Sequence, residues 1–483
     1  MKHITGVDRE QTLLLPETIE DYVAPENPVR FLDAFVGSLD LHALGFSKAI
    51  AAYTGRPAYD PGVLLRLYLY GYLHRIRSSR QLEKECHRNV EVLWLLRKLA
   101  PDFKTIADFR RDHRASFKLV HRQFHRLCHK LKLFGGERVA IDGTKLAAVN
   151  ARDHNYNQKK LEDLMARADA RLEEYLKQLD EADAHACQAE PQLTRAALEE
   201  KIAALREKKD WHEELLAQLH ESQENQLSTT DPDARKMHTA HGTVVGYNAQ
   251  SAVDAKHKLI VADDVTSDGT DLRQLGGMAV EAKQTLAVDQ LEVIADRGYY
   301  NNAEVSTCVE ENITPYISKP DTSANTAQGL YAKKDFAYDP QKDVYLCPAG
   351  TELTHRFNTY ELGRSLRYYR ARGCRKCPLK EKCTRNKGNR TITREEDEPL
   401  MDAMAARVKA QPEKLRQRKA LVEHPFGTLK RWFGYTHFLL KGLDKVRAEW
   451  TLMTLAYNLK RVLNLVTFEQ LMVAVHGKVV RPT

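Results

Sequence analysis

The sequence predicts an α/β protein in which helices flank a mixed β-sheet. Three observations predict this class: helical patterns over residues 28–135, alternating strand and helix patterns from Arg138 onward, and a helical tail from Glu398. A chain of 483 residues is too long for one compact core and should form roughly two to four units. Its charged fraction of 29% and hydrophobic fraction of 42% are ordinary for folded proteins, which excludes extensive disorder.

Residues 1–135 are expected to form an all-α N-terminal domain. Asp60 before Pro61, and Thr105 three residues before Asp108, indicate helix starts. Basic residues gather at the expected helix ends: Arg75, Arg77, Arg80, Arg110, Arg111 and Arg114. Such basic runs, interleaved with aromatic residues, suit contacts with phosphates. The alternative is that each run is only a solvated helix face.

The central region is expected to contain five strands and one helix. The strands are predicted at 138–144, 244–253, 258–265, 290–295 and 313–318, and the helix at 271–286. The first three strands should form an antiparallel meander, whereas the fourth follows a helical crossover and should lie parallel to its partner. This is the order of a ribonuclease H-like fold. We assign this core to residues 136–154 and 227–324, and expect helices over residues 393–483 to complete it.

Two insertions are expected to interrupt this core. In the first, residues 155–226, Leu161, Met165 and Leu172 recur at helical spacing, and Pro191 marks a break, so this segment should be an antiparallel helical hairpin. The second, residues 325–392, is expected to be a small Cys-rich module that resembles a zinc ribbon.

Cysteine spacing supports the second insertion. Its cysteines have the spacing C-x26-C-x2-C-x5-C and are Cys347, Cys374, Cys377 and Cys383. This spacing permits a tetrahedral thiolate site for structural Zn²⁺ in a reducing compartment, and the alternative is four unrelated thiols. The other cysteines are scattered singly and should be reduced and structural: Cys86, Cys128, Cys187 and Cys308.

Charge and hydropathy limit the expected location and partners. The net charge is +8 with a pI near 8.9, a mild basic bias that favours polyanions only where the charge clusters. The N-terminus lacks the pattern of a secretory signal. The most apolar run, Val63 to Leu73, carries Arg66 and is too short to span a bilayer. We therefore expect a cytoplasmic protein and no membrane partner.

Three acidic residues stand in contexts that suit a metal site. Asp142 lies in Ala-Ile-Asp-Gly-Thr-Lys, Asp296 in Ala-Asp-Arg-Gly-Tyr, and Glu423 in Glu-His-Pro-Phe-Gly. The first two end short apolar runs that should be buried strands, and the third falls in a helical pattern. Three such carboxylates can hold two Mg²⁺ ions, because Mg²⁺ prefers oxygen ligands and keeps positions open for water and phosphate. Taken singly, each residue is more often a turn or surface carboxylate.

These motifs, in this order, resemble the DDE transposases of bacterial insertion sequences. Asp142, Asp296 and Glu423 match the catalytic residues of that family, and Gly246-Tyr-Asn-Ala-Gln250 is a further family-like stretch. The resemblance implies binding of terminal inverted repeats and target DNA, cleavage and strand transfer with Mg²⁺ or Mn²⁺, and a homodimer on DNA. It implies that the N-terminal domain reads the DNA ends, with the Cys-rich module as a second candidate for that role, and that the protein associates with the nucleoid when bound to DNA.

One stretch departs from the family pattern. Relatives show Y-x2-R-x3-E-x6-K, but here Arg416 stands at the Tyr position and Lys419 at the Arg position, while Lys430 fits the final Lys. Lys419 and Lys430 are therefore the expected phosphate contacts on this helix, and Arg418 could substitute through a small rotation of the helix.

Two alternatives remain open on the sequence. One is a nuclease or recombinase of another class, but no organised Arg and His set accompanies any tyrosine. The other is a non-catalytic DNA-binding protein derived from a transposase, against which the intact acidic triad argues.

Overall fold

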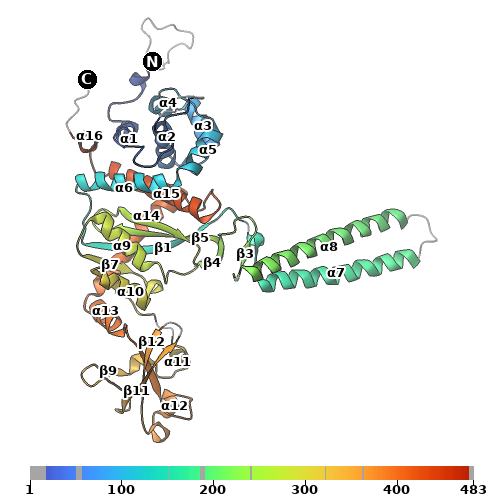
Figure 1. The fold of residues 1–483 in the computed structure, drawn as a ribbon, viewed down its shortest axis with the longest axis vertical. Helices are drawn as coiled ribbons and strands as arrows, with labels where there is room; N and C mark the ends of the chain where they lie inside the picture. Colours follow the sequence, from blue (N-terminus) through green and yellow to red (C-terminus); the bar gives the residue numbers. More distant parts are fainter. Residues whose placement is uncertain are drawn as a thin grey trace, which may run out of the picture.

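The computed structural model describes residues 18–50, 57–150, 152–184, 191–222, 224–239, 242–320, 323–361 and 364–477. Figure 1 shows a helical region, a central sheet below it, a long helical hairpin that projects to one side, and a small sheet at the far end of the molecule. The mixed α/β class predicted from the sequence is confirmed. Cys187 lies outside the described residues.

The N-terminal region is helical, as predicted. Its helices are α1 (Pro28–Gly37), α2 (Pro61–Leu73), α3 (Ser79–Arg88), α4 (Val90–Leu95), α5 (Phe103–Asp112) and α6 (Arg114–Lys130), with a 3₁₀ turn η1 at Ile19–Tyr22. Asp60 caps α2 by accepting a hydrogen bond from the Gly62 N–H, which confirms that start. The predicted start at Thr105 is wrong, because Asp102 caps α5 and accepts the N–H of Thr105 itself.

The central sheet has the order β4-β5-β1-β7-β8, and β6 also pairs with β5. The strands are β1 (Arg138–Ala147), β4 (Arg235–Thr239), β5 (Gly242–Asp254), β6 (Ile260–Thr266), β7 (Leu291–Ala295) and β8 (Ile313–Ile317). The pairs β1–β5 and β5–β6 are antiparallel, and β1–β7 and β7–β8 are parallel. Both predicted orientations are therefore confirmed. Strand β4 was not predicted.

Each face of this sheet is covered by helices, and the two faces belong to different hydrophobic clusters. On one side lie α9 (Leu275–Leu286), α10 (Asn302–Glu310) and α13 (Glu398–Ala410). On the other lie α6, α14 (Pro412–Gly427), a π-helical turn at Thr428–Trp432 and α15 (Leu443–Leu463), while α16 (Phe468–His476) packs on α1. The second cluster runs without interruption from the N-terminal helices to the sheet, so helices α1 to α6 share a core with the C-terminal helices. The division of the chain into domains stays a prediction.

Both insertions have regular structure. The helical hairpin consists of α7 (Gln158–Ala184) and α8 (Pro191–Glu221), and short strands β2 (Asn155–Tyr156) and β3 (Leu227–Ser228) pair at its base. The second insertion forms an antiparallel sheet of order β13-β12-β11-β10-β9, which we call the small sheet. Its strands are β9 (Ala337–Asp339), β10 (Val344–Leu346), β11 (Glu352–Glu361), β12 (Arg364–Arg370) and β13 (Thr391–Glu395), accompanied by short helices α11 (Ala324–Ala327) and α12 (Lys380–Cys383). Among the described residues, no helix combines the length and apolar character needed to cross a bilayer.

Candidate active site

Two of the predicted carboxylates lie level with each other on neighbouring strands. Strands β1 and β7 run parallel with Ala140 opposite Ile294. Asp142 lies two residues after Ala140, inside β1. Asp296 lies two residues after Ile294, directly after the end of β7. Because side chains alternate along a strand, Asp142 shares a face with Ala140, the face on which α14 packs. The fold therefore brings the first two motifs together at the end of the parallel β1–β7 ladder.

Each aspartate is also held by its own loop. Asp142 Oδ1 accepts a hydrogen bond of 3.0 Å from the Gly143 N–H. Asp296 Oδ1 accepts one of 2.7 Å from the Gly298 N–H and caps the 3₁₀ turn at Arg297–Tyr299. A Cβ on Gly298 would stand 2.9 Å from Asp296 Oδ1, so the Asp-Arg-Gly sequence leaves room for this cap.

Asp142 lies in a partly buried, strongly charged environment. Burial raises the pKa of its carboxyl to about 6; the Arg418 guanidinium opposes that shift and the charge of Asp296 adds to it. The Arg418 Nη1 atom stands 3.1 Å from Asp142 Oδ2. Lys430 is half-buried nearby, where burial lowers the pKa of its ammonium group and the charge of Asp142 opposes the shift. Two cations therefore face the first aspartate.

Glu423 does not join this pair. Its side chain is 62% exposed and forms an ion pair of 3.6 Å with Lys419 one helical turn away. Within the described parts of the chain, no three His, Cys, Asp or Glu side chains are grouped closely enough to hold a metal ion. The predicted three-carboxylate cluster is thus not assembled in this conformation.

The rotation of α14 explains both this result and which basic residue lies beside Asp142. Leu421 and Val422 are buried against the sheet, and Arg418 lies three and four residues before them, on the same face. Lys419 and Glu423, four residues apart, share the opposite, solvent-facing side. Arg418 is therefore the basic residue of α14 that contacts Asp142, while the DNA contact predicted for Lys419 stays a prediction.

A further carboxylate, not predicted from the sequence, lies beside the pair. Asp271, just before α9, accepts hydrogen bonds from Asn248 Nδ2 at 2.7 Å and Gln250 Nε2 at 2.8 Å, and its Oδ2 stands 3.3 Å from Lys145 Nζ. Its charge contributes to raising the pKa of Asp142. Tyr299 donates a hydrogen bond to Gln250 Oε1. This network joins the two aspartate motifs to the Gly-Tyr-Asn-Ala-Gln stretch.

Gly143 makes that network possible. A Cβ at this position would stand 2.4 Å from Gln250 Nε2 and 2.7 Å from Asp271 Oδ1, so a side chain would displace both. Asn248 and Gln250 alternate along β5 with apolar residues, and both are fully buried. Polar residues at alternate positions of a buried strand were the sequence signal that could have indicated this network.

The predicted N-terminal contacts fall into two groups, and the buried group is a correction. Arg77 is 8% exposed, donates to the His437 carbonyl at 2.7 Å and pairs with the fully buried Glu449 at 3.2 Å. Arg110 is also 8% exposed and donates to the Tyr72 hydroxyl at 3.3 Å. Both arginines face protein groups because Glu449, on α15, requires compensation in the interior. They are not surface contacts.

The other predicted arginines lie at the surface. Arg75 is stacked over the Trp432 ring at 4.1 Å, and Arg80 over the Phe103 ring at 5.3 Å. Arg111 pairs with Asp108 and Asp112, and Arg114 donates to the Arg111 carbonyl. These positions remain compatible with DNA contact, which stays a prediction.

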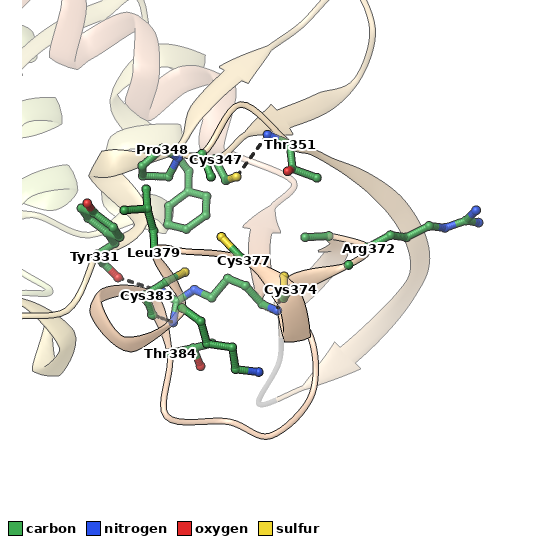
Figure 2. Close-up of a pocket in the computed structure, with 16 residues that line it drawn as sticks. Tyr331, Cys347, Pro348, Thr351, Arg372, Cys374, Cys377, Leu379, Cys383 and Thr384 are labelled. Carbon is green, nitrogen blue, oxygen red and sulfur yellow. Dashed lines mark hydrogen bonds between the residues drawn. The ribbon is translucent and has the colours of Figure 1, made fainter.

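The four cysteines of the second insertion line one pocket, shown in Figure 2. Cys374 and Cys377 flank the 3₁₀ turn at Cys374–Lys376, Cys347 follows β10, and Cys383 ends α12. Cys347 Sγ accepts a hydrogen bond from the Thr351 N–H at 3.2 Å, and Cys374 Sγ one from the Arg390 N–H at 3.4 Å. Burial raises the pKa of Cys383, Arg390 opposes that shift, and the other three thiols add to it. The fold therefore gathers thiols that are scattered in the sequence.

Two family models match parts of the chain. One, described as a transposase DDE domain, matches residues 346–463, which include Glu423, Arg418 and the four clustered cysteines. The other, described as a transposase domain (DUF772), matches residues 17–112 in the N-terminal helices. Neither match includes Asp142 or Asp296. No curated protein matches the chain significantly.

A solved structure is also similar over much of the chain. It is the cryo-EM structure of a piggyBac transposase synaptic complex with hairpin DNA, at 9% identity, covering 94% of this chain and 77% of that one. Its TM-score of 0.33 is too low to carry an argument about fold or function. Through the two family matches at its N-terminal and C-terminal parts, the chain is confirmed as similar to the DDE transposases of insertion sequences.

Proposed function

We propose that this protein is a metal-dependent transposase that binds the terminal inverted repeats of an insertion sequence, cleaves the DNA strands there and transfers them to target DNA. The central sheet supports a ribonuclease H-like core, because an antiparallel β1–β5–β6 meander is followed by a helix and the parallel strands β7 and β8. The observation that carries the proposal is that Asp142 and Asp296 lie side by side on the neighbouring inner strands β1 and β7 of that sheet.

The two aspartates suit a divalent ion. Both offer carboxylate oxygens at the same level of two neighbouring strands, and Asp142 is held near Asp296 at an electrostatic cost that a cation would relieve. Asp142, Asp296 and, by its motif, Glu423 would hold Mg²⁺ or Mn²⁺. When bound, such ions supply Lewis-acid activation of water or of a DNA 3′-hydroxyl. The chain's own part is to fix these carboxylates through the Gly143 and Gly298 amides.

Arg418 and Lys430 would position the DNA backbone. Both cations face Asp142 from α14 and the turn that follows it. A phosphate group that enters the site would meet them on that side, and such contacts fix position rather than sequence. A homodimer on DNA, and recognition of the repeats by the N-terminal helices, complete the proposal.

We also propose that the four clustered cysteines hold a structural Zn²⁺. Four thiols around one pocket are the kind of ligand that Zn²⁺ prefers, and backbone N–H donors to Cys347 and Cys374 provide the hydrogen bonds that thiolates need. In the described conformation the thiols are not grouped closely enough to hold a metal ion, so binding would draw them together. A metal bound there would join β10 to the turn at Cys374–Lys376 and to α12.

A cleavage assay on DNA that carries the element's ends tests the proposed activity. Asp142→Asn, Asp296→Asn and Glu423→Gln should each abolish cleavage in Mg²⁺ while binding to the ends persists. Lys208→Gln, an exposed change on the hairpin, serves as the control and should cleave like the parent. Cleavage within a few fold of the parent would remove the substituted residue from the proposed site.

The exposed position of Glu423 favours a second candidate, a non-catalytic DNA-binding protein derived from a transposase. In that case the parent protein would bind the ends and fail to cleave them with either Mg²⁺ or Mn²⁺. The same assay therefore separates the two candidates. A nuclease or recombinase of another class would instead cleave independently of all three acidic residues.

A further inference from the structure

The small sheet is strongly basic. Residues 337–395, from β9 to β13, contain fourteen Lys and Arg against six Asp and Glu, an excess of eight, and the whole chain has a net charge of +8. The N-terminal helices are also basic, since residues 61–132 contain seventeen Lys and Arg against six Asp and Glu. Because the field at a surface follows local charge density, the small sheet is one of the regions of the molecule that attract a polyanion.

The two faces of the small sheet differ in what they bury. One face holds a hydrophobic cluster of Tyr345, Leu353, Tyr369 and Ile392. The residues that alternate with these point to the other face, which we call the outer face. Part of the outer face is open within the described structure: Phe357 on β11 is 54% exposed and Leu346 on β10 is 44% exposed. Figure 1 shows this sheet at the end of the molecule opposite the N-terminal helices.

Aromatic rings form a platform on the outer face. Phe357 and Tyr368 are cross-strand partners in β11 and β12, and their rings stack with centroids 4.7 Å apart and planes inclined by 13°. Tyr360, three residues further along β11, is 74% exposed but lies on the opposite face, so it is not part of this platform. Large rings held flat at a surface are costly to leave in water and provide flat surfaces on which a nucleobase can stack.

Exposed arginines surround the platform. Arg370 alternates with Tyr368 along β12, and Arg356 precedes Phe357 in β11; both are exposed. Arg372 follows β12 and is also exposed. Flat aromatic rings with flanking arginines match the two requirements of a strand with unpaired bases, which are stacking for the bases and positive charge for the phosphates.

We propose that the outer face of the small sheet binds DNA with unpaired bases, through base stacking on Phe357 and Tyr368 and phosphate contacts with the neighbouring arginines. This inference rests on the proposed function, because a transposase exposes such bases where it opens or cleaves the ends of an element. Fully paired duplex offers the same phosphates but no base faces, so the platform should distinguish the two forms of DNA.

Binding of the full-length protein to fluorescent oligonucleotides tests this proposal without any chemistry. The probes are a short mixed-sequence single strand and its duplex, in buffer without added divalent cations. Phe357→Ala and Tyr368→Ala should each weaken single-strand binding about fivefold or more and leave duplex binding nearly unchanged. Phe357→Leu should also lose affinity, because it keeps an apolar side chain but removes the ring. Leu176→Ala, an exposed apolar change on α7, is the control.

Two further measurements locate the contact. A single strand with 5-iododeoxyuridine should photo-crosslink to the peptide of residues 352–361. Arg370→Gln should reduce the slope of log affinity against log salt by about 0.7, the change expected when one phosphate contact to a single strand is lost, while Lys208→Gln should not change it.

Equal binding of single strand by the parent and both alanine variants, with unchanged thermal unfolding, would overturn the proposal, as would crosslinks confined to other peptides. A parent that binds duplex as tightly as single strand, or that prefers an acidic peptide, would overturn it too. Because the binding test measures no cleavage, a negative result would not affect the proposed catalytic function. Likewise, loss of cleavage in the Asp142 variant would not affect the proposal that the small sheet binds DNA.

Discussion

Removal of the Arg77 side chain should destabilise the protein rather than directly lower its affinity for DNA. Arg77 Nη1 donates to the His437 carbonyl at 2.7 Å and stands 3.2 Å from Glu449 Oε1, and its guanidinium lies over the Tyr435 ring at 4.8 Å. Arg77→Ala removes all three contacts. It also leaves Glu449, whose side chain is fully buried, without its nearest cation.

The expected magnitude follows from what remains around Glu449. Burial raises the pKa of this carboxyl, and Arg110 and Arg77 oppose that shift, together with the N–H groups of Leu439 and Leu440. Loss of one partner of a buried ion pair costs about 3–5 kcal/mol. Since Arg110 and the two backbone donors stay, we expect a loss near the lower limit, about 3 kcal/mol in the free energy of unfolding.

Equilibrium unfolding in urea measures this loss directly. Arg80→Ala is the matched control, because Arg80 is exposed and rests on the Phe103 ring, and its loss should change stability by less than about 0.5 kcal/mol. Glu449→Gln should also destabilise, since it leaves Arg77 without a carboxylate. If Arg77→Ala unfolds like the parent and binds the element's ends less tightly, Arg77 is a DNA contact and the reasoning from burial is refuted.

Three further changes test other parts of the structure. Asp271→Asn removes a charge near Asp142 but keeps an oxygen for its hydrogen bonds. The Mg²⁺ concentration for half-maximal cleavage should therefore rise several-fold at unchanged thermal stability. An unchanged Mg²⁺ requirement would contradict this role of Asp271. Purified protein should contain about one zinc ion, lost in Cys377→Ser and kept in Cys308→Ala, as metal analysis would show. Burial alone would raise the pKa of Asp263, but its hydrogen bond to His121 and the His121 charge outweigh burial and hold it at about 2. A carboxyl whose pKa is lowered by folding stabilises the folded protein above pH 4, and this stabilisation is lost as the pH falls toward 2. Over this window the free energy of unfolding of the parent should therefore drop by about 2 kcal/mol more than that of Asp263→Asn. Equal acid sensitivity of the two proteins in urea unfolding would contradict this prediction.

The sequence alone determined the features that depend on neighbouring residues. Strands β1, β5, β6, β7 and β8 were predicted because runs of apolar residues bounded by turn signals specify a buried strand locally. The cap of α2 at Asp60 is equally local. The pairing of Asp142 with Asp296 was predictable in outline, because both follow apolar runs and a helical crossover makes their strands parallel.

Other features depend on partners far away in the chain, and only the tertiary structure decided them. Arg77 belongs to the interior because Glu449 lies 372 residues later, a distance that no local pattern spans. Asp271 meets Lys145 and Gln250 only once β1, β5 and the start of α9 come together. The rotation of α14 likewise depends on where Leu421 and Val422 find a surface to pack against, and a shift of one residue along a helix turns a side chain by about 100°. That rotation, fixed by packing, places Arg418 beside Asp142 and leaves Glu423 in solvent.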